Sequence, residues 1–279
     1  YKGTLILIVA SVIVYILNII VVNQYLQEIR TEGINYELFR EMKISNELFD
    51  QVFRQESKEK EGLTSSTYNN KYDSYDVLTT YMLVHDFNTL EKKKIKKGNI
   101  NLLLESLTYD LKFNELKNYY YVFSHDIESF PIKHHSERNP IVGFENTWNA
   151  YRSYGGDRKH EGTDLMVIDN ISGKYQVVSM TDGVVEKKGW LEQGGYRIGI
   201  RSKSGAYFYY AHLESYADEL EVGDFIEAGD FLGYVGDSGY GPEGTTGKFD
   251  VHLHLGIYIE SEIGEVSVNP YYLLRYIDY

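Results

Sequence analysis

The chain has 279 residues, 43% of them hydrophobic, which is enough for one sizeable domain with accessory segments or for two small domains. Its formal net charge of -13 argues against a nucleic-acid partner, because phosphate binding needs clustered Lys and Arg, and the one dense basic run, residues 91–97, has no interleaved aromatic residues. Cysteine is absent, which excludes disulfides, a thiol nucleophile and cysteine-ligated zinc, so any metal ion must be held by histidines and carboxylates.

The first candidate element is an apolar run at residues 5–22, LILIVASVIVYILNIIVV. It has about 18 residues without a charge, and as a helix it would be roughly 27 Å long, close to the thickness of the hydrocarbon core of a bilayer. A cleaved signal peptide is the alternative, but no small-residue cleavage pattern follows the run. We therefore expect residues 1–22 to form an N-terminal flank and an uncleaved, single-pass transmembrane signal anchor, with Lys2 on the cytoplasmic side.

Residues 23–125 are predicted to be mainly helical. They are rich in Glu, Lys, Leu and Tyr, contain no proline, and place apolar residues at helical spacing in NYELFREMKISNELFDQVFRQ and NLLLESLTYDLKFNELKNYYYVF. A polar stretch at 61–76 and Gly98 divide the region into about three helices. The helical region could be a spacer between the membrane and the following domain, or it could restrain that domain. A protein partner, if there is one, is expected to bind to this region. Residues 126–140 are predicted to be a linker.

The segment from 141 to 279 is predicted to be a second domain, mainly antiparallel β. Glycine becomes frequent, helical periodicity ends, and short β-rich runs alternate with Gly and Asp turns. The intervals between these runs are too short for the helices of βαβ units, so a curled antiparallel sheet is expected. The predicted fold class is therefore α+β, with an N-terminal transmembrane helix and helical region followed by a mainly antiparallel β domain.

Two histidines lie one residue apart in the predicted strand VHLHLGIYI, residues 251–259. Side chains alternate between the faces of a strand, so His252 and His254 share one face while the apolar residues occupy the other. In YFYYAHLES, the same alternation places His212 on a face with Phe208 and Tyr210. Two half-buried β surfaces should therefore carry imidazoles.

A further pair lies upstream in RKHEGTDLMVID, where His160 precedes Asp164 by four residues. Gly162 disfavours a continuous helix, so we expect His160 to end a loop and Asp164 to begin a strand. The helical zinc motif HExxH is therefore absent, although Glu161 follows His160 directly.

Together these features predict a zinc site. A catalytic zinc ion needs three N or O ligands and one open position for water. His160, Asp164 and one histidine of the 252/254 pair would supply that set, and the other member of the pair and His212 would be free to move protons or stabilise a developing oxyanion.

The ordered set of motifs resembles the M23 (LytM or lysostaphin-like) family of zinc endopeptidases, which cut peptidoglycan peptides. The resemblance covers roughly residues 144–272 and rests on HEGTD, YYAHLES, VGDFIEAGDFLGYVGDSG and VHLHLG, which occur here in the family's order. It implies a LytM-type peptidase domain over 141–279, one Zn²⁺ ion, a stem-peptide substrate, and a catalytic domain outside the cytoplasm facing the cell wall.

The resemblance also implies a role for individual residues. His160, Asp164 and His254 match the zinc ligands, and His252 with His212 matches the catalytic pair. Tyr154, six residues before the first ligand, matches a tyrosine that contacts the tetrahedral intermediate in some members. The family usually has proline before its HxH motif, whereas this chain has Asp250 and Val251 there, a departure that touches the rim of the site.

Within the family, GWLEQGGYRIGI and GYGPEGTTGKFDVHLHLGIY most closely resemble the sporulation-associated L-Ala-D-Glu endopeptidases. The implied substrate has a free carboxylate on D-Glu, which cations near the motifs could neutralise: Arg152, Arg158, Arg197 and Lys248. Two alternatives remain. One is a membrane-anchored scaffold that binds a partner in an extracytoplasmic complex, and the other is a carbohydrate-binding β module whose histidines only pack.

Overall fold

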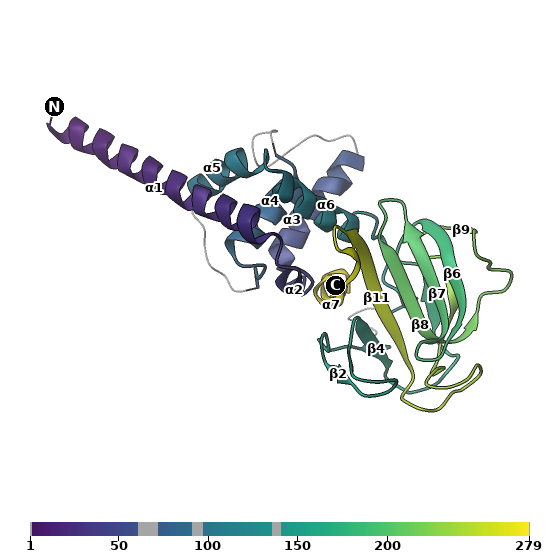
Figure 1. The fold of residues 1–279 in the computed structure, drawn as a ribbon. Helices are drawn as coiled ribbons and strands as arrows, with labels where there is room; N and C mark the ends of the chain where they lie inside the picture. Colours follow the sequence, from purple (N-terminus) through teal and green to yellow (C-terminus); the bar gives the residue numbers. More distant parts are fainter. Residues whose placement is uncertain (1, 61–71, 91–96, 136–140, 279) are drawn as a thin grey trace. The chain divides into compact units, whose positions relative to one another are not determined.

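The computed structural model describes residues 2–60, 72–90, 97–135 and 141–278 (Figure 1). Most of the basic run at 91–97 and of the polar stretch at 61–76 therefore lies outside the described residues, as do residues 136–140 of the predicted linker. The chain forms two compact units, one made of Tyr1–Phe39 and Lys43–Tyr120 and the other of Arg40–Met42 and Tyr121–Tyr279. The short segment Arg40–Met42 thus belongs to the unit that the C-terminal half forms.

The first unit is helical, with α1 (Lys2–Glu32), α2 (Tyr36–Phe39), α3 (Asn46–Lys60), α4 (Ser74–Val84), α5 (Lys97–Leu107) and most of α6 (Leu111–Ser124). Helix α5 contacts α1 and α4, and α3 contacts α4. Helix α4 begins with a capping box, in which Asp73 and Asp76 each accept a hydrogen bond from the other's backbone N–H, at 2.8 and 3.0 Å. The box satisfies two of the N–H groups that the start of a helix leaves unpaired.

The transmembrane helix expected over residues 5–22 is wrong. The run is the first part of one 31-residue helix, α1, which continues without a break into polar residues as far as Glu32 (Figure 1). Within the described ranges, no helix combines the length and the apolar character that crossing a bilayer requires. The expectation rested on residues 5–22 alone, whereas the helix that contains them extends ten residues further, through the polar segment NQYLQEIRTE.

The second unit is built on one large antiparallel sheet in which seven strands follow the order β1-β4-β11-β8-β7-β6-β9. These strands are β1 (Val142–Gly143), β4 (Thr163–Val167), β6 (Gly183–Leu191), β7 (Gly195–Ser202), β8 (Tyr207–Tyr216), β9 (Phe225–Ile226) and β11 (His252–Ser261). Three more join beside this path: β5 (Gln176–Val178), β10 (Phe231–Val235) and β12 (Gly264–Val268). A separate ribbon pairs β2 (Tyr151–Arg152) with β3 (Arg158–Lys159), and α7 (Tyr271–Ile277) follows the last strand.

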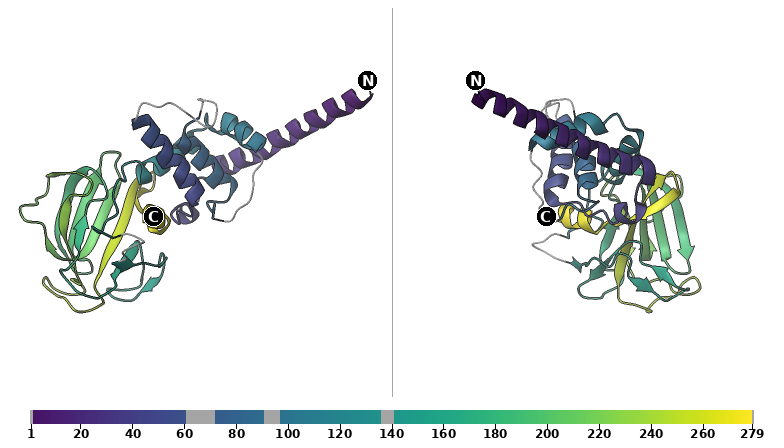
Figure 2. Two further views of the ribbon diagram at one scale, coloured as in Figure 1. Left: turned by 180° about the vertical axis from the view of Figure 1, so that it is seen from behind. Right: turned by 60° about the vertical axis from the view of Figure 1, so that its left-hand side comes forward.

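Alternation along β11 divides its side chains between core and site. Leu253, Leu255 and Ile257 are completely buried among other apolar side chains, while His252 and His254 point to the opposite face. Strand β8 contributes Phe208 and Tyr210 to the same core. The antiparallel β domain that the sequence predicts is therefore present, and two further views in Figure 2 show the curvature of its sheet.

Strand register brings the motifs of the sequence together. Strand β11 lies between β4 and β8, and His254 is paired with Asp164 on one side and with Ala211 on the other. His212 follows Ala211 directly, so three adjacent strands carry the ionisable groups across one short stretch of sheet.

His212 departs from the alternation that the sequence predicts. Its φ is 63°, in the left-handed region, and its N–H donates to the carbonyl of Gly194 at 2.8 Å. Phe208 and Tyr210 face the core, but His212 faces the groove that contains His252 and His254. The predicted shared face for His212 with Phe208 and Tyr210 is thus wrong, because the irregular backbone at this residue reverses the side chain.

Candidate functional site

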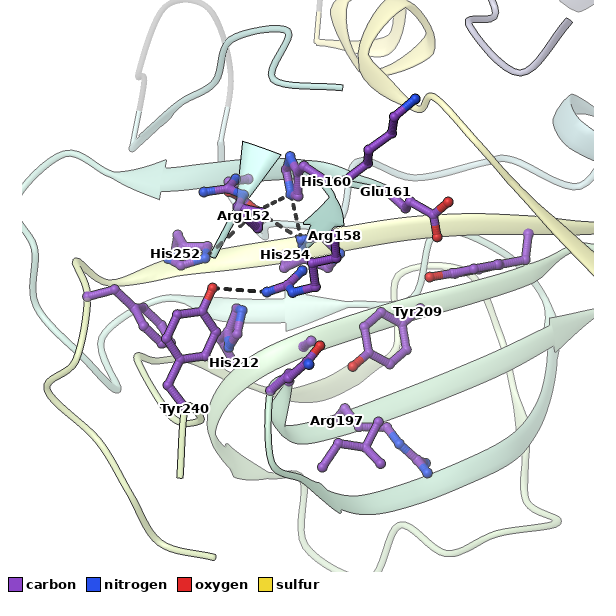
Figure 3. Close-up of a pocket in the computed structure, with 18 of the residues that line it drawn as sticks. Arg152, Arg158, His160, Glu161, Arg197, Tyr209, His212, Tyr240, His252 and His254 are labelled. Carbon is purple, nitrogen blue, oxygen red and sulfur yellow. Dashed lines mark hydrogen bonds and ion pairs between the residues drawn. The ribbon is translucent and has the colours of Figure 1, made fainter. Parts of the chain in front are cut away.

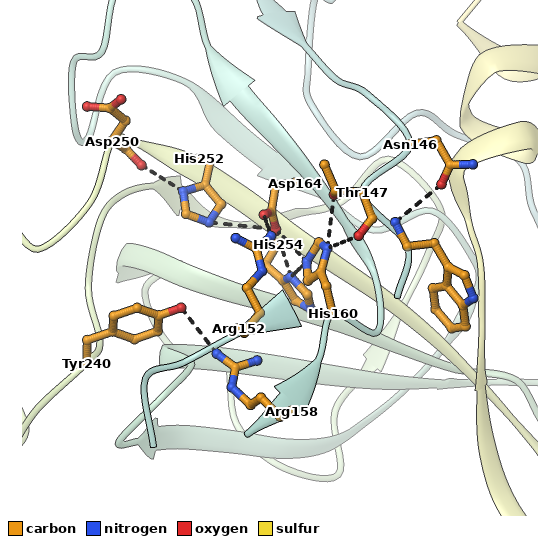
Figure 4. Close-up of polar contacts among 11 residues, drawn as sticks. Asn146, Thr147, Arg152, Arg158, His160, Asp164, Tyr240, Asp250, His252 and His254 are labelled. Carbon is orange, nitrogen blue, oxygen red and sulfur yellow. Dashed lines mark hydrogen bonds and ion pairs between the residues drawn. The ribbon is translucent and has the colours of Figure 1, made fainter. Parts of the chain in front are cut away.

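Three side chains from different segments converge on one point. His160 lies in the loop between β3 and β4, Asp164 is in β4, and His254 is in β11. The His160 Nε2 atom lies 3.0 Å from Asp164 Oδ1 and 3.0 Å from His254 Nδ1, and His254 Nδ1 lies 2.9 Å from the same carboxylate oxygen. Figure 4 shows these contacts. The three form a group of ligand atoms that all lie within 4.8 Å of one another.

The ring of His160 has a fixed orientation. The side chain is buried, and its Nδ1 lies 3.1 Å from the carbonyl oxygen and 3.0 Å from the hydroxyl of Thr147 (Figure 4). A carbonyl oxygen only accepts hydrogen bonds, so Nδ1 carries the proton and the lone pair of Nε2 points toward Asp164 and His254.

Asp164 lies between an arginine and two histidines. Arg152 holds Oδ2 at 2.6 Å, which leaves Oδ1 for His160 and His254. Burial by itself would raise the pKa of Asp164, but the close contacts with His160 and His254 outweigh burial and hold the pKa of this carboxyl far below its usual range. The group is therefore a carboxylate over the whole physiological pH range.

His212 and His252 form a second pair beside this cluster, with ring centroids 4.7 Å apart. The Nδ1 of His212 donates to the carbonyl of Ser238 at 2.8 Å, and the Nδ1 of His252 donates to the carbonyl of Asp250 at 2.7 Å. In both rings this fixes the proton on Nδ1 and leaves Nε2 as the free nitrogen.

Burial lowers the pKa of both His212 and His252. The neighbouring imidazoles of His252 and His254 lower that of His212 further. Both rings are therefore neutral at neutral pH, and each can accept a proton at Nε2 or, once protonated, donate from it.

Tyr154 is not brought to this cluster. Its hydroxyl donates to Glu192 at 3.3 Å, and its ring stacks on that of Tyr240 with centroids 4.2 Å apart. Tyr240 in turn lines the groove, and its hydroxyl accepts a hydrogen bond from Arg158 at 3.2 Å (Figure 3). The assignment of a catalytic role to Tyr154 stays a prediction.

The histidines lie in a groove of about 750 Å³. Figure 3 shows His212, Tyr240 and His252 toward one side of it and Tyr209 and Arg197 toward another. Of the four cations that the sequence singles out, Arg152, Arg158 and Arg197 line the groove, whereas Lys248 is exposed and is not among the lining residues. Burial raises the pKa of Tyr209 to about 12, so its phenol is protonated and can donate a hydrogen bond.

Two residues, Gly162 and Phe249, support the site in a way that the sequence did not predict. A Cβ at Gly162 would lie 2.5 Å from the carbonyl oxygen of Leu255 and 2.6 Å from a ring carbon of His254, so only glycine allows this approach. Phe249 packs against both His212 and His252, with centroids 4.6 and 5.0 Å away. Gly162 lies within the HEGTD motif, and Phe249 lies three residues before His252. Closeness in sequence to the predicted site residues was therefore the signal that could have identified both.

The three converging side chains fit a zinc ion. Ligand atoms at about 2.0–2.2 Å from one ion cannot lie more than roughly 4.4 Å apart, and the three separations here are 2.9–3.0 Å. Two imidazole nitrogens and one carboxylate oxygen are also the donor types that zinc takes when no thiolate is present.

Comparisons with known proteins agree with this arrangement. Residues 158–270 match the sequence profile described as Peptidase family M23. The L-Ala--D-Glu endopeptidase of Bacillus subtilis (strain 168) is 46% identical over 132 residues, which are 47% of this chain and 39% of that protein. Lysostaphin of Staphylococcus simulans is 29% identical over 122 residues, 43% of this chain and 22% of that protein. The chain therefore spans well under half the length of these curated relatives.

A solved structure extends the similarity beyond the β domain. A crystal structure of a candidate glycyl-glycine endopeptidase, lytM, from Ruminococcus gnavus ATCC 29149 is 40% identical, with a TM-score of 0.71. The match covers 91% of this chain and 95% of that one, so it includes most of the helical region.

Proposed function

Because this chain belongs to peptidase family M23, we propose that it is a zinc-dependent endopeptidase that hydrolyses peptide bonds in the stem peptides of bacterial peptidoglycan. One observation carries the proposal: the convergence of His160, Asp164 and His254 beside two further histidines whose Nε2 atoms are free, all in one groove. Since the substrate lies outside the cytoplasm, we place the working site of the domain there.

His160, Asp164 and His254 would hold the zinc ion through Nε2, Oδ1 and Nδ1. A bound zinc ion at such a site lowers the pKa of a coordinated water molecule and polarises the scissile carbonyl. Arg152 keeps the Asp164 carboxylate in place, and Thr147 keeps the His160 ring in place, so the ligands do not have to reorganise when the metal binds.

The second histidine pair would handle the proton. His252, whose Nε2 lies 3.8 Å from Asp164 Oδ1, is close to the metal ligands and is the nearer candidate for the general base. His252 would accept a proton from the attacking water at Nε2 and pass the same proton to the leaving amine. His212, whose Nε2 also carries a lone pair in the neutral ring, would accept a hydrogen bond from that water or from the leaving amine. The backbone carbonyls of Ser238 and Asp250 stabilise the protonated form of each ring when it forms. Tyr154 would require the stack on Tyr240 to open before it could reach the reacting atoms.

For the bond, we propose L-Ala-D-Glu. The B. subtilis relative at 46% identity carries that name, whereas the R. gnavus structure is named for a glycyl-glycine bond. The two bonds differ in charge, because D-Glu adds a carboxylate beside the scissile amide and glycine adds none. The three arginines that line the groove, Arg152, Arg158 and Arg197, favour the acidic substrate.

The test is a cleavage assay with the full chain, loaded with one equivalent of zinc. Purified stem peptides and a pentaglycine peptide are incubated with this protein and with its His252→Ala variant, and the products are identified by mass spectrometry. Release of an L-Ala-containing fragment by the parent protein alone supports the proposal. Stoichiometric zinc without cleavage of either peptide would contradict it and favour a binding scaffold.

A further inference from the structure

Among the described residues, Arg197 differs from Arg152 and Arg158 because its guanidinium makes no hydrogen bond or ion pair. Arg152 is paired with Asp164 at 2.6 Å, and Arg158 donates to the hydroxyl of Tyr240 and to the carbonyl of Tyr154. Within the described ranges no carboxylate lies at ion-pair distance from Arg197, and its Nη1 atom is buried without a hydrogen-bond partner. A guanidinium nitrogen left unpaired in this way is costly unless a ligand completes it.

Two acidic side chains of this sheet, Glu265 and Glu186, are already engaged. Glu265 lines the groove, but its carboxylate binds Arg201 at 2.9 Å, and Arg201 also holds Glu186 through two hydrogen bonds. Neither carboxylate is therefore available to Arg197 without breaking an existing pair. The positive charge of Arg197 faces the groove uncompensated.

Tyr209 lies beside Arg197 and adds a donor. The two side chains come from the neighbouring strands β8 and β7 and lie on the same side of the groove (Figure 3). The hydroxyl of Tyr209 lies directly over Gly194, where a Cβ would approach it to 2.1 Å, so the phenol is held in a defined position. A planar guanidinium next to a protonated phenol forms a receptor for a carboxylate.

The distance from the metal ligands suits a residue next to the scissile bond. Ala211 is paired with His254, and Tyr209 lies two residues earlier on the same face of β8, about 6.6 Å away along the strand. The ring centroids of Tyr209 and His254 are 6.0 Å apart. Since one residue of an extended peptide spans roughly 3.3–3.6 Å, the residue next to the scissile carbonyl covers about half of this separation, and its side group can cover the rest.

We infer that Arg197 and Tyr209 form a carboxylate-binding subsite that selects a stem peptide with a free carboxylate on the residue next to the scissile bond. The inference rests on the proposed function for its substrate class, but it makes a separate claim about charge. Amidation of that carboxylate, which replaces an anion with a neutral group of the same size, removes the partner of Arg197 and leaves the rest of the peptide unchanged.

The experiment compares two stem peptides that differ only in this group, one with D-Glu and one with its amide. We expect the parent protein to cleave the acidic peptide with the higher kcat/KM. Arg197→Gln should lower kcat/KM for the acidic peptide by about 10- to 100-fold, mainly through KM, and leave the amidated peptide almost unaffected. Tyr209→Phe should act in the same direction with a smaller effect, and Arg197→Lys should restore part of the selectivity.

Two controls separate this effect from general loss of structure or charge. Lys187→Gln removes an exposed cation from the same groove and should leave the ratio between the two peptides unchanged. The zinc content of Arg197→Gln should equal that of the parent protein, because Arg197 contacts none of the proposed ligands.

Binding is measured separately, by calorimetry of both peptides with zinc-loaded His252→Ala protein with and without Arg197→Gln. If the parent protein cleaves the peptides and Arg197→Gln lowers kcat/KM equally for both, the subsite is wrong and the proposed function stands. If the parent protein cleaves neither peptide but binds the acidic one more tightly, and Arg197→Gln abolishes that preference, the proposed function is wrong and the subsite stands. Neither cleavage nor selective binding overturns both.

Discussion

The two ends of the groove differ in how their polar groups are satisfied. At the metal end, Asp164 contacts His160, His254 and Arg152, and each histidine of the second pair is fixed by a backbone carbonyl. At the other end, Arg197 has a buried nitrogen without a partner. The difference indicates that the first end is organised to hold a reacting centre in place, whereas the second is completed only when substrate arrives.

The largest effects should come from separating the roles of the two histidines on β11. His254→Ala removes a proposed ligand, so we expect the protein to lose zinc. The activation free energy should then rise by several kcal/mol, which lowers kcat/KM on the order of 10³-fold or more. His252→Ala should keep one equivalent of zinc and lose roughly 10²- to 10⁴-fold in kcat, the range for a general acid or base. Elemental analysis and kinetics of both variants check this. Equal zinc loss in both would show that the proposed division of roles is wrong.

Gly162 tests how closely the metal end is packed. A methyl group there meets the Leu255 carbonyl and the His254 ring at 2.5–2.6 Å, and the backbone cannot yield. We expect Gly162→Ala to weaken zinc binding by about 10- to 100-fold, as other changes behind metal ligands do. Gly143→Ala is the matched control, because nothing lies within 4 Å of a Cβ at that position. Zinc titration with a chelator measures both variants, and equal affinities would contradict the packing argument.

Acid should weaken the same end of the groove through its neutral histidines. The pKa values of His212, His252 and His254 are lowered by burial, so below pH 6.5 the unfolded chain binds protons that the native protein does not. Stability is thus greatest above pH 6.5 and is lost as pH falls. The lowered pKa of Asp164 changes stability in the same direction, because the stability that its carboxylate contributes begins to be lost as the pH falls below about 4.

The measurement is the thermal midpoint of the metal-free protein between pH 7.5 and 5. A midpoint that rises as pH falls would contradict these pKa directions. The matching kinetic expectation is that the acid limb of kcat/KM lies below pH 6.5, with about a tenfold loss per pH unit beyond it.

The sequence predicted the parts of the site that depend on local pattern. Alternation in β11 places His252 and His254 on one face, and the strand pairing that brings Asp164 opposite His254 follows from an antiparallel sheet with one buried face. The left-handed backbone at His212 could not be predicted, since the sequence there shows only a regular alternation and the irregularity depends on the neighbouring Gly194.

Pairing between distant charges was likewise hidden in the sequence. Arg152, Arg158 and Arg197 looked equivalent as cations near the motifs, and only the fold shows that the first two are engaged and the third is not. The transmembrane prediction failed for a different reason. It rested on the uncharged length of residues 5–22, and the helix that forms there continues to Glu32.

The smallest expected effect concerns Glu161, which follows His160 as the glutamate does in HExxH zinc sites. Its carboxylate is 45% exposed and binds Arg40, whose guanidinium also donates to the carbonyl and hydroxyl of Ser267. An exposed ion pair contributes less than about 1 kcal/mol, so Glu161→Gln should change kcat/KM by less than about fivefold. Glu186→Gln, which disrupts an ion pair with Arg201 elsewhere on the sheet, is the matched control. A loss of 100-fold or more in Glu161→Gln alone would make Glu161, rather than His252, the proton acceptor.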